Sequence, residues 1–174
     1  PFVFITTDET YSQRAINISS EFDLNPWILG SGYEYRRLDY FSKTKPFFIL
    51  PIDFPSKPNV VKPMSDLQYS TAELKHWDIA PDNLFYLNNA GHDFSITSHY
   101  MKKKSEFRKN LQKIIDRGLS EDIVLSALTT QPAEALGMQK SLGKIAPGYD
   151  ANLVVVDGEY FDPKSKIVSV WIEG

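Results

Sequence analysis

The sequence contains no cysteine among its 174 residues, which excludes disulfides and thiolate metal sites. No apolar run approaches the roughly 18 residues that a membrane-spanning helix needs, so we expect no membrane span. The net charge of −3 argues against a nucleic-acid partner, which would favour a strongly basic chain. What remains is an ordinary globular composition, with 42% hydrophobic residues, that can bury the core of one domain.

Short apolar runs alternate with helical patterns along most of the chain. We expect strands at residues 2–5, 27–29, 47–50 and 94–98, each followed by helical spacing. Strands that alternate with helices are typical of parallel βα units, so the sequence predicts an α/β fold with four such units. A Pro-rich stretch at residues 52–80 interrupts this alternation, and loops of that length usually have a function.

The first expected helix begins just after the first strand. The hydroxyl of Thr7 or the carboxylate of Asp8 can cap its start. Ala15, Ile18 and Phe22 follow at helical spacing, and we expect them to form its inward face.

The final part of the chain has a different character. Pro132 suits the first turn of a helix, and Gly137 suits the C-terminal cap of that helix. Strands are expected at residues 151–157 and 166–172, joined by a loop rather than by a helix. They predict a hairpin or meander, not a fifth βα unit.

Two segments of this final part form one longer pattern. Residues 129–137 read TTQPAEALG, and residues 142–158 read LGKIAPGYDANLVVVDG. This order resembles the C-terminal signature of the amidohydrolase superfamily, the relatives of imidazolonepropionase and dihydroorotase. Gln131 stands for the usual Asn and Asn152 for the usual Asp. The resemblance implies a distorted (β/α)8 barrel of the TIM type, with a small β-sandwich built from both chain ends.

On that template the chain is the C-terminal half of the barrel (residues 1–140) followed by the C-terminal strands of the sandwich (residues 141–174). Because the chain begins inside an expected strand, we expect a piece of a longer protein whose missing N-terminal half is its partner. Open strand edges and an apolar face then favour self-association of the isolated piece. The alternative is an independent doubly wound α/β domain with a β appendage.

The resemblance also implies a function. Its members are hydrolases that act on carbon–nitrogen bonds other than peptide bonds in a small-molecule substrate. They use one or two divalent, zinc-like ions to activate water, and a carboxylate to shuttle the proton. Half a barrel cannot assemble such a site, so we expect this chain to be inactive alone. The alternative is a non-catalytic amidohydrolase-like scaffold or binding domain that has lost its metal ligands.

Two strand ends lack the histidine that the resemblance places there. Thr6 stands at the first of these positions, and a neutral hydroxyl is a poor zinc ligand. Asp8, two residues on, can offer a carboxylate oxygen, although it also suits the cap of the following helix. At the second position, Gly30 and Ser31 offer no ligand but permit a sharp turn, and such a loop can cradle an anion on its N–H groups.

The three histidines differ in their expected roles. His99 follows the fourth strand, where relatives carry the aspartate that binds metal and acts as general base. Histidine can do either, because its pKa lies near neutrality, or it can be a hydrogen-bonded structural residue. His76 lies in the Pro-rich stretch beside Trp77, where it can contact a ligand over the barrel mouth or pack against the domain. We expect His92 to be a surface or capping residue.

Overall fold

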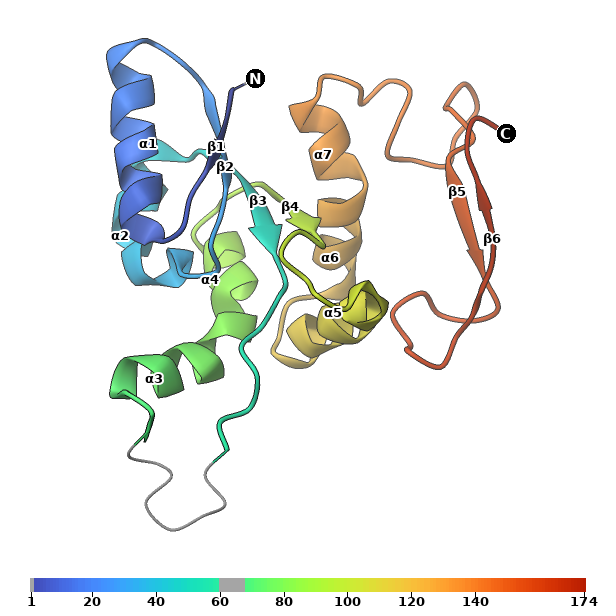
Figure 1. Cartoon of the computed structure of the whole chain (residues 1–174). Coiled ribbons are helices and arrows are strands. Elements are labelled where there is room, and N and C mark those ends of the chain that lie inside the picture. Colours follow the sequence, from blue (N-terminus) through green and yellow to red (C-terminus); the bar gives the residue numbers. More distant parts are fainter. Residues whose placement is uncertain (1, 60–67) are drawn as a thin grey trace.

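A four-stranded parallel sheet forms the centre of the fold in the computed structural model, which describes residues 2–59 and 68–174 (Figure 1). Its strands run in the order β1-β2-β3-β4, and all three pairings are parallel. They are β1 (Phe2–Ile5), β2 (Pro26–Leu29), β3 (Phe47–Pro51) and β4 (Phe94–Thr97). The alternation in the sequence therefore predicted the strands, and their parallel pairing, to within about one residue at each end.

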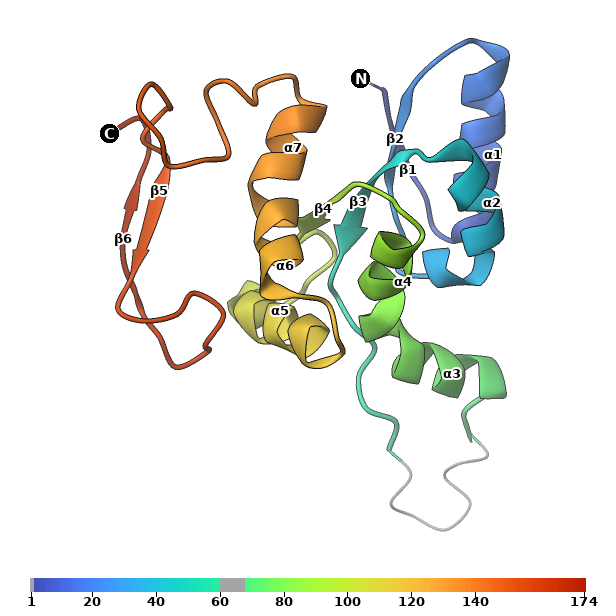
Figure 2. The same cartoon turned by 180° about the vertical axis from the view of Figure 1, so that it is seen from behind.

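Helices flank this sheet at both of its ends. They are α1 (Glu9–Glu21), η1 (Glu34–Arg37), α2 (Leu38–Thr44), α3 (Thr71–Ile79), η3 (Ala80–Asp82), α4 (Asn83–Asn89), η4 (Lys104–Glu106), α5 (Phe107–Asp116), α6 (Glu121–Leu128) and α7 (Thr130–Ala135). Figures 1 and 2 both show α1 beside β2, and α6 and α7 beside β4. Among the described residues, no helix is long and apolar enough to cross a membrane. Helix α3 falls in the Pro-rich stretch, of which residues 60–67 lie outside the described part.

One face of the sheet is packed and the other is not. The alternate residues Phe48 and Leu50 of β3, and Phe94 and Ile96 of β4, are buried against the helices. The residues between them on β3 and β4 are only half-buried. Strand β1, at one edge, is mostly exposed. The hydrophobic core therefore lies on one side of the sheet, under the helices.

The predicted inward face of α1 is wrong in part. Ala15 is buried, but Ile18 and Phe22 are 49% and 68% exposed. The buried stripe includes Ser12 and Ser19 instead, because both hydroxyls have partners inside the protein. Ser19 donates to the Ala15 carbonyl at 2.8 Å, which removes most of the cost of burying a hydroxyl.

The hairpin at the C-terminal end stands apart from the helices (Figures 1 and 2). Strands β5 (Leu153–Val156) and β6 (Ile167–Trp171) pair antiparallel, as predicted. Many of its apolar side chains are exposed, among them Val154, Val155, Val168, Val170 and Trp171. Arg108 of α5 holds the connecting loop by donating to three of its carbonyls, those of Tyr160, Asp162 and Ser165.

The signature residues make contacts within this C-terminal region and, at Gln131, with the sheet. Gln131 Oε1 accepts a hydrogen bond from the backbone N–H of Phe94 at 2.7 Å, so its side chain satisfies the edge strand β4. Asn152 Oδ1 accepts from the N–H of Glu173 at 3.1 Å, just after β6. Gly143 has a φ of +89° and lies so close to α7 that a Cβ would be 2.8 Å from the Thr129 carbonyl oxygen. The signature therefore has a structural role here.

Candidate functional site

A cavity of about 180 Å³ opens at the carboxyl ends of β2, β3 and β4. Carboxyl ends of parallel strands are where barrel and open α/β proteins place their sites. The lining residues come from three strand ends, from α3 and from η3: Ser31, Gly32, Pro51, Asp53, Phe54, His76, Ala80 and Tyr100. The structure thus brings together two residues that the sequence singled out separately, Ser31 and His76.

A buried carboxylate shapes the β2 side of this cavity. Glu34 is fully buried, and its carboxylate accepts from the backbone N–H groups of Ser31 at 2.6 Å and Gly32 at 3.1 Å. The Asn83 amide donates to the same carboxylate at 2.7 Å, while its oxygen accepts from the Tyr35 N–H at 2.8 Å. The loop after β2 therefore does hold an anion on its N–H groups, but that anion is the protein's own Glu34.

Gly30 is required by the same arrangement. A Cβ at this position would lie 2.6 Å from Glu34 Oε1 and 3.1 Å from Leu50 Cδ2. Its place is therefore behind the cavity wall, as the residue that lets the carboxylate approach the backbone.

His76 enters the cavity from a stack of aromatic rings. Its ring lies 3.7 Å from that of Tyr33, nearly parallel, and Tyr35 Oη is 3.3 Å from His76 Nδ1. The Arg36 guanidinium covers the Tyr33 ring at 4.3 Å. Burial, and then the positive charge of Arg36, lower the pKa of His76 to about 4. At neutral pH the imidazole is therefore uncharged and can take part in hydrogen bonds without adding charge to the cavity.

His99 lies on the exposed loop that follows β4. Its backbone N–H donates to Thr97 Oγ1 at 3.1 Å, and its ring packs against Tyr100 with 4.2 Å between centroids. Tyr100, which has a φ of +66°, is the residue that lines the cavity. His99 is thus at the strand end where the resemblance placed it, and its catalytic or metal-binding role stays a prediction.

Thr6 and Asp8 have structural partners. Thr6 is buried, and its hydroxyl donates to the Leu29 carbonyl at 2.9 Å while lying 2.9 Å from Ser12 Oγ. Asp8 Oδ1 accepts from the N–H groups of Thr10 and Tyr11, which confirms its role as the cap of α1. The Thr6 hydroxyl links β1 to β2 and to α1.

His92 is a correction to the sequence analysis. It is 4% exposed, with its ring edge-on to Phe48 at 5.5 Å, and so it is neither a surface residue nor a cap. Burial, and then the charge of Lys45, lower its pKa against a smaller opposing effect of the Pro46 carbonyl. The position follows Gly91, whose positive φ turns the chain inward ahead of β4.

Metal ligands are sparse around the cavity. Across residues 2–59 and 68–174, no three His, Cys, Asp or Glu side chains come together in a group that could hold a metal ion. Thr6 uses its hydroxyl elsewhere, and the oxygens of Glu34 receive donors from Ser31, Gly32 and Asn83. The donor set of this chain therefore does not fit a metal centre by itself.

Four residues of the site were not predicted from the sequence: Glu34, Asn83, Asp53 and Tyr100. Glu34 had a signal: Ser31-Gly32-Tyr33-Glu34 follows the Ser-x-x-Glu pattern of a capping box, in which the Glu carboxylate reaches back to the Ser N–H. Asn83 had none, because its contact with Glu34 joins residues 49 positions apart.

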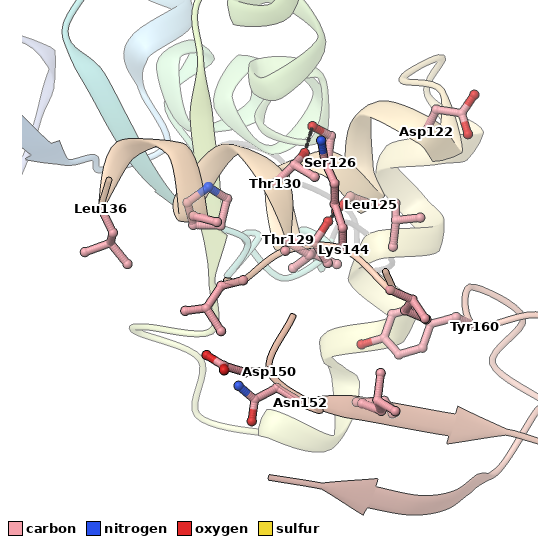
Figure 3. Close-up of a pocket in the computed structure, with 18 of the residues that line it drawn as sticks. Asp122, Leu125, Ser126, Thr129, Thr130, Leu136, Lys144, Asp150, Asn152 and Tyr160 are labelled. Atoms are coloured by element: carbon pink, nitrogen blue, oxygen red, sulfur yellow. Dashed lines mark hydrogen bonds between the residues drawn. The ribbon is translucent and has the colours of Figure 1, made fainter. Parts of the chain in front are cut away.

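A much larger cavity, of about 1090 Å³, lies away from the strand ends. It separates α6 and α7, which carry Ser126, Thr129 and Thr130, from the start of the hairpin at Asp150 and Asn152 (Figure 3). Its walls are largely aliphatic, with Asp122, Lys144, Asp150 and Tyr160 as their titratable residues. We interpret it as a gap between two parts of the fold, and the strand-end cavity as the better candidate for a functional site.

The sequence model of the Amidohydrolase family matches residues 79–174, which is more than half of the chain. The chain belongs to this family. A curated relative, the amidohydrolase tasK of Hapsidospora irregularis, is 44% identical over 57 residues, which make up 33% of this chain and 6% of the relative. The family assignment confirms the resemblance carried by the C-terminal signature.

Solved amidohydrolases share the fold of the whole chain. The crystal structure of an amidohydrolase from Thermotoga maritima MSB8 matches with a TM-score of 0.77 and 24% identity, over 100% of this chain and 42% of that one. A prolidase solved with N-methylphosphonate-L-proline matches with a TM-score of 0.66 and 19% identity, over 99% of this chain and 43% of that one. This chain therefore spans less than half the length of these relatives.

Proposed function

We propose that this chain is the C-terminal half of an amidohydrolase-type barrel, whose complete form hydrolyses carbon–nitrogen bonds other than peptide bonds in a small molecule. The observation that carries the proposal is the cavity at the carboxyl ends of three parallel strands, with His76 in its wall and His99 beside it. Family membership supports a hydrolase-like function.

Three features support the half barrel. One face of the sheet is only half-buried, as the inner wall of an open barrel would be. The edge strand β1 exposes Phe2 and Ile5 by 59% and 69%. The wide gap between the helices and the hairpin leaves room for further strands of a sandwich (Figure 3). The missing N-terminal half of the same protein is thus its proposed partner, and without it we expect the open edges to cause self-association.

The residues of this chain would position the substrate and handle a proton. We assign the transfer of a proton to His99, because its ring packs against Tyr100, which lines the cavity. Neutral His76 would donate or accept a hydrogen bond at the cavity wall. The described residues of this chain bring no set of metal ligands together, so any divalent ion of the complete protein would need ligands from outside them.

A second candidate is a non-catalytic amidohydrolase-like binding domain. The specific observation that favours it is Thr6, which stands where the resemblance implies a ligating histidine and whose hydroxyl is bonded to the Leu29 carbonyl. A binding module would lose its metal ligands but keep the strand-end cavity.

The test compares this 174-residue chain with the longer protein in which we propose that it lies. Both are assayed with N-acyl amino acids and cyclic amides, with dipeptides as the comparison that contains a peptide bond, and both are analysed for bound metal. Turnover by the longer protein, absent from the shorter chain and reduced by His99→Ala without loss of folding, supports the proposal. A folded longer protein with neither metal nor turnover favours the binding domain, and a gene that encodes no further barrel strands ahead of these 174 residues overturns the half barrel.

A further inference from the structure

The strand-end cavity has the charge and the walls of a site for a positive group. We propose that it accepts an ammonium or guanidinium group of the substrate or ligand, with Asp53 as the counter-ion. This inference rests on the proposed function for placing the substrate at the strand ends, and it adds the chemical class of the substrate.

The charge of the lining is the first argument. Among the eight lining residues, Asp53 is the only Asp, Glu, Lys or Arg. His76 adds no charge at neutral pH, since its pKa lies at about 4. The other carboxylate near the wall, Glu34, is buried and receives the N–H groups of Ser31 and Gly32, so it is not offered to a ligand. The net charge of the lining is therefore negative, which attracts a cation and repels an anion.

The aromatic walls are the second argument. Phe54, Tyr100 and His76 line the cavity, and the faces of aromatic rings attract cations. The Phe54 ring already carries one, because Lys113 Nζ lies 5.1 Å from its centroid. A second contact between a cation and an aromatic ring lies nearby, where the Arg36 guanidinium covers the Tyr33 ring at 4.3 Å. A ligand cation that enters the cavity would meet these rings and the Asp53 carboxylate together.

The size of the cavity selects a head group rather than a whole molecule. Its volume of about 180 Å³ is below the roughly 300–1,000 Å³ typical of cavities that enclose a complete small ligand. A propylguanidinium or butylammonium group fits this scale. The wall is also fixed in advance by Glu34 and Asn83, so little ordering is needed when the group binds.

The test is an NMR titration of this chain with propylguanidinium, with its neutral analogue propylurea, and with butyrate. We expect chemical shift changes at the cavity residues with propylguanidinium, binding of propylurea weaker by about tenfold, and no binding of butyrate. Asp53→Asn should weaken propylguanidinium by about fivefold or more. The matched control Asp39→Asn, an exposed aspartate of α2 outside the cavity, should leave binding unchanged.

Equal binding of propylurea, or an Asp53→Asn variant that binds as well as the unsubstituted chain, would overturn the inference. Lys113→Met removes the protein's own cation beside Phe54. Binding of propylguanidinium that survives this change supports the cavity as its site, and loss of binding would overturn the inference.

The proposed function can fail separately from this inference. A longer protein that hydrolyses neutral amides without preferring cationic ones contradicts the inference alone. Cation binding without any turnover contradicts the hydrolase and leaves the site standing.

Discussion

The C-terminal signature and the strand ends of this chain follow the family to different extents. Residues 129–158 keep the pattern closely, and there Gln131 and Asn152 bind backbone N–H groups. At the strand ends, Thr6 stands where the resemblance implies a ligand, and the N–H groups of the β2 loop bind the carboxylate of Glu34. The likeness of residues 129–158 to the family therefore concerns the fold, while the chemistry of the chain must be judged from the strand ends.

We expect the largest loss of stability from a substitution at the strand ends. Glu34→Ala removes the acceptor of the half-buried Ser31 and Gly32 N–H groups and of the buried Asn83 amide, and leaves these donors without a protein partner. We expect the free energy of unfolding to fall by about 3 kcal/mol, measured by chemical denaturation.

The control for Glu34 is Glu21→Ala, an exposed glutamate at the end of α1, which should change the free energy by less than about 0.5 kcal/mol. Equal effects of the two changes would mean that the hydrogen bonds of Glu34 add no stability, and the cavity wall would then not be fixed in advance.

The second effect tests the signature as architecture. Gly143→Ala would place a Cβ 2.8 Å from the Thr129 carbonyl oxygen, at a φ of +89°. We expect a loss of about 2–3 kcal/mol, from backbone strain and from the contact with a backbone atom that cannot move away.

Gly148→Ala is the matched control, because its φ of +87° is nearly the same but a Cβ there would meet nothing within 4 Å. It should cost only the conformational part, about 1 kcal/mol. Thermal unfolding of both variants measures the difference. A Gly148 variant as unstable as the Gly143 variant would show that close packing of the signature loop against α7 is unimportant.

The sequence predicted those parts of the fold that depend on local pattern. The four strands, the cap at Asp8 and the antiparallel hairpin were all visible as periodicity, cap chemistry and turn residues. The buried face of α1 was not, because Ser12 and Ser19 look polar until their partners are known. The burial of His92 was missed for a related reason, since its neighbour Phe48 lies 44 positions earlier.

The candidate site was predictable only in pieces. His76 and Ser31 were each noted, but nothing in the sequence placed them in one cavity, because 45 positions and a Pro-rich stretch separate them. Asp53 and Tyr100 carried no local signal at all. Sites on loops at strand ends depend on how distant strands pair, which the order of residues does not state.

The third prediction concerns the departure of the signature at Gln131. Gln131→Leu keeps the size of the side chain but leaves the Phe94 N–H of the edge strand without its acceptor. We expect a loss of about 1–2 kcal/mol and faster amide exchange at Phe94, measured by hydrogen exchange. Gln139→Leu, on an exposed loop residue, should change neither quantity. Unchanged exchange at Phe94 in the Gln131 variant would mean that this amide does not protect the strand.

The smallest expected effect is a pH dependence of the free energy of unfolding. It concerns the strand ends alone, because His76 belongs to them and the signature contains no histidine. Burial, followed by the charge of Arg36, lowers the pKa of His76 from 6.5 to about 4 in the folded protein. The unfolded chain therefore takes up a proton at a higher pH than the folded one, so stability is complete above pH 6.5 and falls as the pH drops toward 4. Because the ring is partly exposed, we expect the free energy of unfolding to fall by about 1 kcal/mol over this pH range rather than by the full linkage value.

The variant His76→Phe tests this assignment. It keeps a ring against Tyr33 and should make the free energy of unfolding less dependent on pH between 4 and 6.5, while the buried His92 continues to contribute in the same direction in both proteins. Denaturation midpoints of the two proteins between pH 4 and 7 measure the difference, and parallel profiles would contradict a half-buried, neutral His76 at the cavity wall.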